Sequence, residues 1–178
     1  MNLADKKNIF LYFILLAGLI LAKLYHREAS NLDLGWILYP TVWLVTFFSG
    51  VVFELSAEGG FVDTSQMLII DKSCSGMNFM LICICVLSFT YLPRLPWKPA
   101  YFCIFLGLSY GFTVLVNACR IIQAIWLREK FENQLPFKPE VIHEMQGILV
   151  YVFFLILFFL ISRYIFNHSI LRSHEKIV

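Results

Sequence analysis

The chain has 178 residues, of which 60% are hydrophobic and only 15% are charged. Soluble domains are typically about 45–50% apolar and about 25% charged, so this chain has too little polar surface to coat a water-soluble globule. Its formal net charge is only +2 and no basic block occurs in it, which argues against a nucleic-acid-binding protein. Composition therefore excludes a soluble enzyme and a disordered tail, and it indicates a single integral membrane domain over residues 1–178.

The apolar runs between charged residues predict the transmembrane helices. A spanning helix needs about 20 mostly apolar residues, with about 17–25 as the usual range. Four runs meet this requirement directly, and the first does so when Lys23 snorkels toward the headgroups. We therefore expect an all-α membrane protein with five transmembrane helices, over about residues 8–25, 34–53, 74–93, 99–120 and 143–165.

Two longer connections separate these predicted helices. Residues 54–73 are acidic, contain the turn signal Gly59-Gly60, and include a short apolar run at 67–70. This pattern favours a short strand or hairpin-like segment that lies over the membrane surface before the third helix. Residues 128–142 mix charged residues with two prolines, which is typical of an irregular loop.

The distribution of basic residues gives conflicting indications of orientation. Residues 93–98 and the C-terminal tail are basic, which favours a cytoplasmic position for both. With five spans this places the N-terminus outside, whereas Lys6 and Lys7 favour a cytoplasmic N-terminus. Charge alone therefore supports the two orientations about equally.

Three reactive or charged residues lie at the edges of predicted spans. Cys74 opens the third helix, Arg120 closes the fourth and His143 opens the fifth. The third helix starts, the fourth ends and the fifth starts on the same side of the membrane. We therefore expect these three side chains to lie at one level, close enough to form a site within the bundle.

Other polar residues share the helix faces of these three, at the spacing that brings side chains together on one side of a helix. Asn78 accompanies Cys74, Gln146 accompanies His143, and Thr113 and Asn117 precede Arg120 on a single polar stripe. When the polar faces of three neighbouring helices meet inside a bundle, they form a polar interior site.

The three residues together predict acyl transfer. A thiolate is the reactive form of cysteine, and a helix N-terminus or nearby positive charge favours it; a Cys–His pair is the usual arrangement for attack on an acyl carbon. The planar fork of Arg120 suits a developing oxyanion, and His143 can protonate a leaving amine. One cysteine and one histidine fall short of the usual zinc ligand set, so we expect neither a metal nor another cofactor.

Each residue also has a simpler structural interpretation. A membrane cysteine is most often a small buried residue, an arginine at a helix end often snorkels to the headgroups, and His143 alone suits an interfacial loop. An alternative of another class is a non-catalytic membrane scaffold or a small transporter, in which Cys74 tolerates replacement. A third is an unrelated membrane Cys/His peptidase that processes a signalling peptide.

The order and spacing of these motifs resemble the exosortase/archaeosortase family over about residues 36–165, and the short length is similar to small exosortases such as the K type. The residues that carry the resemblance are Cys-Ser-Gly at Cys74, Ser75 and Gly76, Asn-x-x-Arg at Asn117 and Arg120, and His143 followed by Gly147. Met77 and Asn78 depart from the Leu-Arg-like pair that is common after Cys-Ser-Gly in larger members.

The resemblance implies a multi-pass enzyme of the bacterial cytoplasmic (inner) membrane, with its active site on the extracytoplasmic face, its N-terminus outside and its C-terminus inside. Its substrates would be membrane-tethered proteins with a C-terminal sorting motif, and its acceptor a lipid, a glycan or another group. By matching position, Cys74 would be the nucleophile, Arg120 the transition-state stabiliser and His143 the acid/base.

Overall fold

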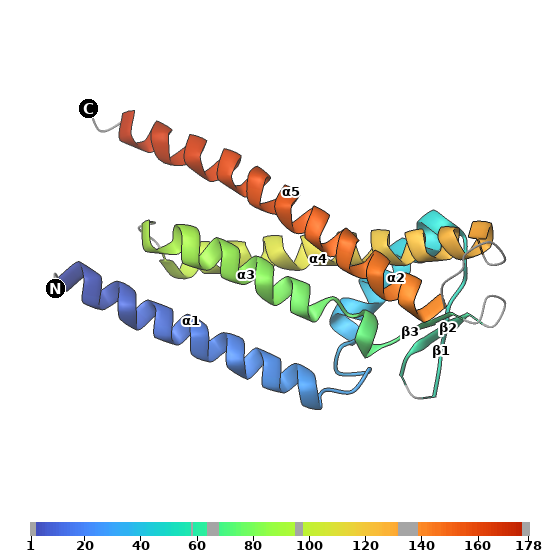
Figure 1. Cartoon of the computed structure of the whole chain (residues 1–178). Coiled ribbons are helices and arrows are strands. Elements are labelled where there is room, and N and C mark those ends of the chain that lie inside the picture. The colour runs from blue at the N-terminus through green and yellow to red at the C-terminus, as the bar shows by residue number, and fades with distance from the viewer. Residues whose placement is uncertain (1–2, 58, 64–67, 95–97, 132–138, 176–178) are drawn as a thin grey trace.

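The computed structural model describes residues 3–57, 59–63, 68–94, 98–131 and 139–175 (Figure 1). Five α-helices account for most of this part of the chain: α1 (Leu3–Glu28), α2 (Gly35–Ser49), α3 (Met77–Tyr91), α4 (Lys98–Phe131) and α5 (Pro139–Glu175). Three short strands and two 3-10 turns complete it: β1 (Glu54–Leu55), β2 (Phe61–Asp63), β3 (Leu68–Ile70), η1 (Lys72–Cys74) and η2 (Leu92–Arg94).

Four helical stretches in the described part of the chain are long and apolar enough to cross a membrane. They are Ile9–Glu28, Lys72–Tyr91, Pro99–Leu127 and Met145–Phe166. Helix α2 is apolar but has only 15 residues, so it is about 22 Å long against a hydrocarbon core of about 30 Å. The predicted class, an all-α integral membrane protein, is confirmed, with four candidate spans and one shorter apolar helix.

Helix α2 is shorter than the apolar run 34–53 that predicts it. Gly50 follows its last turn with φ +74°, and the Gly50 N–H donates to the Thr46 carbonyl. This left-handed C-cap ends a helix, so the remaining apolar residues lead into β1 instead of completing a span. The hydrophobicity of the run 34–53 does not reveal that the helix ends at Ser49.

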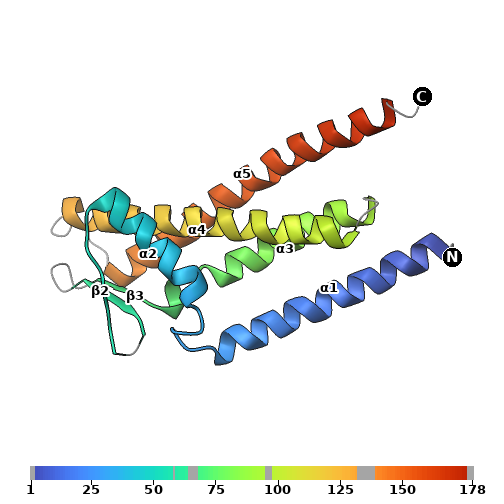
Figure 2. The ribbon, with the colours of Figure 1, turned by 180° about the vertical axis from the view of Figure 1, so that it is seen from behind.

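The two ends of the described chain lie at the same end of the helices, on either side of α3. Figures 1 and 2 place the start of α1 and the end of α5 at the same end of the helices, with the three strands at the other end. The expectation of an external N-terminus and an internal C-terminus depended on five crossings, whereas the described part of the chain has four candidate spans and one shorter apolar helix. The side of the membrane on which each terminus lies stays a prediction. The end of α3 and the start of α4 lie at the same end as the two termini.

The strands form an antiparallel sheet in the order β1-β2-β3, with Glu54 opposite Val62 and Phe61 opposite Ile70. Phe61 and Ile70 are buried and belong to the core that joins the sheet to α2 and α4. The ring of Phe61 packs edge-on against Tyr39 of α2, with ring centroids 5.0 Å apart. Strand β3 leads directly into η1, so the sheet positions the segment that carries Cys74.

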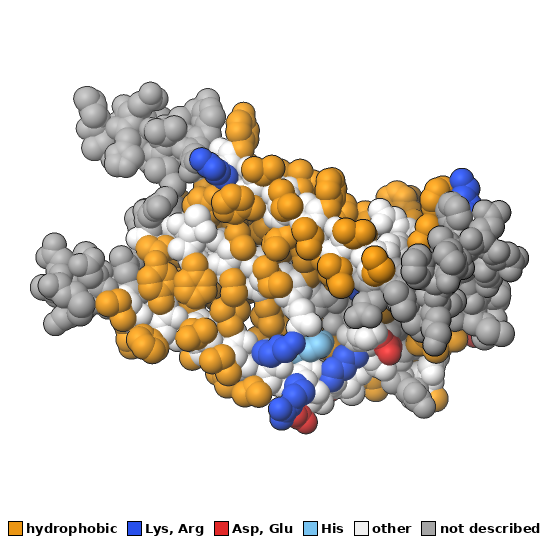
Figure 3. Space-filling model, in the orientation of Figure 1, with side chains coloured by type: hydrophobic (Ala, Val, Ile, Leu, Met, Phe, Trp, Pro, Cys, Tyr) orange, Lys and Arg blue, Asp and Glu red, His pale blue; other side chains and the backbone are white. Residues whose placement is uncertain are grey.

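Helices α3 and α4 form the centre of the bundle, and α1 is peripheral. Helix α4 packs against α2, α3 and α5, whereas only 6% of the apolar window of α1 is buried within the protein. Both ribbon views place α1 and α5 on opposite sides of α3. Hydrophobic side chains cover most of the described helix surface in Figure 3, as expected where lipid surrounds the helices.

Candidate functional site

Cys74 lies in a tight turn before α3, and not in the first turn of that helix as the sequence predicts. Asp71 caps this turn: its Oδ1 accepts hydrogen bonds from the Ser73 N–H (2.9 Å) and the Ser73 hydroxyl (2.6 Å). The Cys74 N–H donates to the Asp71 carbonyl at 2.9 Å. These local bonds fix the backbone of Cys74, whose side chain is buried.

Gly76 allows this turn to lie against α4. Its φ of +68° is in the left-handed region that favours glycine, and a Cβ there would lie 3.0 Å from Thr113 Cγ2 and 3.4 Å from Asn117 Cγ. Any larger residue would push the Cys74 turn away from α4. The third position of the Cys-Ser-Gly motif therefore requires glycine for two reasons, the left-handed backbone conformation and the lack of space for a Cβ.

A chain of hydrogen bonds connects the Cys74 turn to Arg120 of α4 through Tyr151 of α5. The fully buried Asn117 donates from Nδ2 to the Cys74 carbonyl. Its Oδ1 accepts from the Tyr151 hydroxyl at 3.0 Å. Arg120 Nη1 in turn donates to the Tyr151 hydroxyl at 2.9 Å, and the guanidinium carbon lies 5.2 Å from the centre of the Tyr151 ring.

Arg120 lies within α4, and the expectation that it closes the helix is wrong. The helix continues to Phe131 because mostly apolar residues follow Arg120, and the apolar span itself reaches Leu127. A charge inside a span is tolerated when protein groups solvate it. Here Tyr151 provides a hydroxyl acceptor and a ring face.

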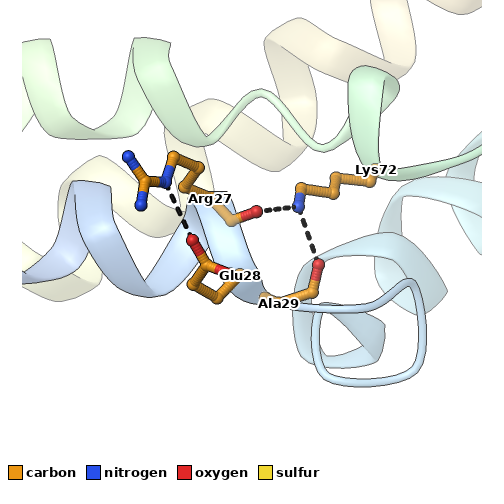
Figure 4. A network of polar contacts seen from close by, with 4 residues as sticks. All are labelled: Arg27, Glu28, Ala29 and Lys72. Atoms are coloured by element: carbon orange, nitrogen blue, oxygen red, sulfur yellow. Dashed lines mark hydrogen bonds and ion pairs between the residues drawn. The ribbon is translucent and has the colours of Figure 1, made fainter.

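The end of α1 is attached to the same turn through Lys72 (Figure 4). Lys72 Nζ donates to the carbonyl oxygens of Arg27 (2.7 Å) and Ala29 (2.8 Å). A cation that binds the last carbonyls of a helix stabilises its C-terminal end. Both side chains of the neighbouring Arg27–Glu28 ion pair are exposed to solvent. Such exposed ion pairs contribute little to the stability of a protein.

An open pocket of about 550 Å³ lies beside the Cys74 turn. Its wall combines the end of α1, the η1 turn, the first residues of α3, and one residue each from α4 and α5. The polar residues that line it are His26, Asp71, Lys72, Ser73, Ser75, Asn78, Arg120 and Tyr151. The pocket is large enough for several residues of an extended peptide and contains both acidic and basic groups.

Comparison with known protein families identifies the family to which this chain belongs. The family model described as transmembrane exosortase matches residues 9–160, a range that includes every motif above. The chain belongs to the transmembrane exosortase family. No curated protein and no solved structure matches it.

The structure brings most of the predicted site residues of this exosortase together. Cys74, Ser75, Gly76, Asn78, Thr113, Asn117 and Arg120 all lie in or against the η1 turn and its pocket. Gln146 is half-buried in α5 and is not among the pocket residues. His143 lies in the first turns of α5, but its side chain is outside the part of the chain whose side chains are described.

Tyr151 and His26 are among the pocket residues that were not predicted from the sequence as parts of the site. Tyr151 lies four residues after Gly147 and eight after His143, so the helical spacing that grouped the other polar residues also includes it. His26 lies near the end of the first predicted helix, between Lys23 and Arg27. No spacing rule reveals that this helix end reaches the third helix.

Gly147 of α5 allows Arg120 to lie across that helix. A Cβ at Gly147 would lie 3.0 Å from Arg120 Nε and 3.3 Å from Cζ. We therefore expect Gly147→Ala to displace the guanidinium and to slow substrate cleavage by up to about 100-fold, the cost of about 1 Å of misplacement. Gly111→Ala on α4 is the control, because a Cβ there meets nothing within 4 Å. Equal cleavage rates for the two variants would contradict this role.

Proposed function

We propose that this exosortase is a membrane-embedded cysteine peptidase or transpeptidase that cleaves the C-terminal sorting signal of membrane-tethered exported proteins. The observation that carries the proposal is the hydrogen-bonded chain from the Cys74 turn through Asn117 and Tyr151 to Arg120, beside a pocket of peptide size. Family membership supports the class of protein-sorting peptidase. The acceptor is water, a lipid or a glycan.

In the first half of the reaction, the Cys74 thiolate attacks the carbonyl carbon of the scissile peptide bond. A C–S bond forms and the carbonyl oxygen becomes an oxyanion, which the Arg120 guanidinium stabilises by charge and by paired N–H donors. The C–N bond then breaks, and His143 gives a proton to the leaving amine. The products are a thioester on Cys74 and the released C-terminal fragment.

In the second half, the acceptor attacks the thioester carbon. The C–S bond breaks, its electron pair returns to Cys74 as a thiolate, and the new C-terminus of the substrate is joined to the acceptor. The acceptor loses one proton to a base of the pocket, and His143 takes up one proton from water before the next cycle. Water as acceptor gives hydrolysis, and an amine or hydroxyl gives transfer. The same covalent intermediate serves both outcomes.

We place the pocket on the extracytoplasmic face of the bacterial cytoplasmic membrane. The start of α1, the end of α3 with η2, the start of α4 and the end of α5 lie at the end opposite the strands, and basic residues occur in or next to each of them. Basic segments favour the cytoplasm. At the pocket end the basic residues are interspersed with acidic ones, as in Arg27 with Glu28 and Lys72 with Asp71.

The test is a cleavage assay with the purified full chain in lipid nanodiscs. Candidate substrates are tagged proteins from the same genome that end in a short motif, a hydrophobic helix and a basic cluster. We expect release of the C-terminal fragment and a transient adduct on the enzyme whose mass equals the N-terminal product, removed by hydroxylamine as a thioester is. Absence of both from every such substrate would favour the scaffold or transporter alternative.

A further inference from the structure

A histidine from the peripheral helix α1 lies at the Cys-Ser-Gly turn. His26 Nε2 is 3.3 Å from the hydroxyl oxygen of Ser75, the residue directly after Cys74. Ser75 is 2% exposed, so this contact is made inside the pocket wall, and His26 itself is half-buried and lines the pocket. Figure 3 shows histidine surface among basic side chains on this face.

The charged groups around His26 come from several elements. Lys23, on the same helix, donates to the Asn78 side chain of α3, and Lys72 of η1 donates to backbone carbonyls of the α1 end. Asp71 accepts bonds from Ser73. Arg120 of α4 and Tyr151 of α5 complete the ionisable side chains of the pocket wall.

His26 and Arg120 approach the turn from different helices. The Cys74 carbonyl is held by Asn117 of α4, which Tyr151 of α5 supports, whereas Ser75 faces His26 of α1. Helices α1 and α5 lie on opposite sides of α3 in both ribbon views. His26 therefore reaches the turn from α1, a different helix from α5, which carries His143.

We propose that His26 is the base that activates the acceptor in the second half of the reaction, through the hydroxyl of Ser75. This inference rests on the proposed function. As the acceptor attacks the thioester carbon, its O–H or N–H proton passes to Ser75 Oγ, and the proton of Ser75 passes to His26 Nε2. The acceptor atom forms the new bond to the acyl carbon, and the C–S electron pair leaves on Cys74. His26 then releases its proton to water at the pocket mouth.

The decisive variant is His26→Gln in the full chain in nanodiscs, with the tagged substrate of the cleavage assay. We expect one equivalent of C-terminal fragment per enzyme at close to the wild-type rate. Steady turnover should then fall by about 100-fold or more, the usual contribution of a general base, while the thioester on Cys74 accumulates. Ser75→Ala should give the same pattern. The control is Arg27→Gln, because Arg27 is the next residue on α1 and its side chain is exposed and pairs with Glu28.

Hydroxylamine separates this role from a structural one. It is a strong nucleophile that needs no base, so it should restore turnover in His26→Gln, which a misfolded site would not allow. Unchanged turnover, loss of the first equivalent of fragment, or failure of hydroxylamine to restore turnover would each overturn the proposal. If His26→Gln does not fold, the same three results with Ser75→Ala decide the question. The proposed function fails separately, if the wild-type chain forms neither fragment nor thioester.

Discussion

Cys74→Ala is expected to abolish cleavage of the tagged substrate, with a loss of about 10⁴-fold or more, because no other group replaces a nucleophile that forms the covalent intermediate. The variant should still fold, since the turn depends on bonds made by Asp71 and Ser73 and by the backbone of Cys74. Fragment release on a gel and intact-protein mass measure the two parts of this result. Neither fragment nor adduct should be detectable.

Cys83→Ala is the matched control for this result. Cys83 lies on α3, outside the η1 turn, and is fully buried in the core formed with α4 and α5. Its replacement removes a sulfur of the same kind at a modest cost in packing and should leave the cleavage rate close to that of the wild type. A Cys74→Ala variant that still released fragment would remove Cys74 from the mechanism, because another group would then have to be the nucleophile.

Arg120→Lys is expected to lower the cleavage rate by about 100- to 1,000-fold, the usual cost of removing one oxyanion donor. A lysine keeps the charge but loses the planar fork, so it cannot both bond the Tyr151 hydroxyl and direct paired N–H groups into the pocket. The loss should fall on kcat, because the interaction is made with the transition state. Thermal unfolding in detergent checks that the variant is folded.

Tyr151→Phe separates the positioning of Arg120 from its charge. The phenylalanine keeps the ring beneath the guanidinium but removes the hydroxyl that connects Arg120 and Asn117. We expect a smaller loss, about 10-fold, in line with a hydrogen bond to a charged group. Full activity of Arg120→Lys, with or without an effect of Tyr151→Phe, would make Arg120 an interfacial anchor.

Much of the site could be predicted because helix order and residue spacing are properties of the sequence. The alternation of spans places Cys74 and Arg120 at one end, and the spacing of Thr113, Asn117 and Arg120 places them on one face of α4. The structure connects this face to the Cys74 turn through Asn117. The assigned roles of Cys74, Arg120 and His143 stay predictions until the variants are measured.

The remaining features depend on tertiary structure or on local backbone geometry. Gly50 ends α2 through a left-handed cap, so this helix is shorter than the apolar run 34–53 that predicts it. Arg120 looks like a helix end in the sequence, because its solvation by Tyr151 is visible only once α5 is in place. His26 reaches Ser75 only because the end of α1 is attached at Lys72.

The position of Cys74 in a sheet-braced turn has a consequence for how the protein responds to its bilayer. Helices tilt when the hydrocarbon thickness changes, and a nucleophile carried on a helix turn would rise or sink with that tilt. Here β3 and the Asp71 cap hold the backbone of Cys74, and hydrogen bonds through Asn117 and Tyr151 connect that backbone to the Arg120 guanidinium. We therefore expect the Cys74 turn and Arg120 to move together when the helices tilt, so that their separation changes little with membrane thickness.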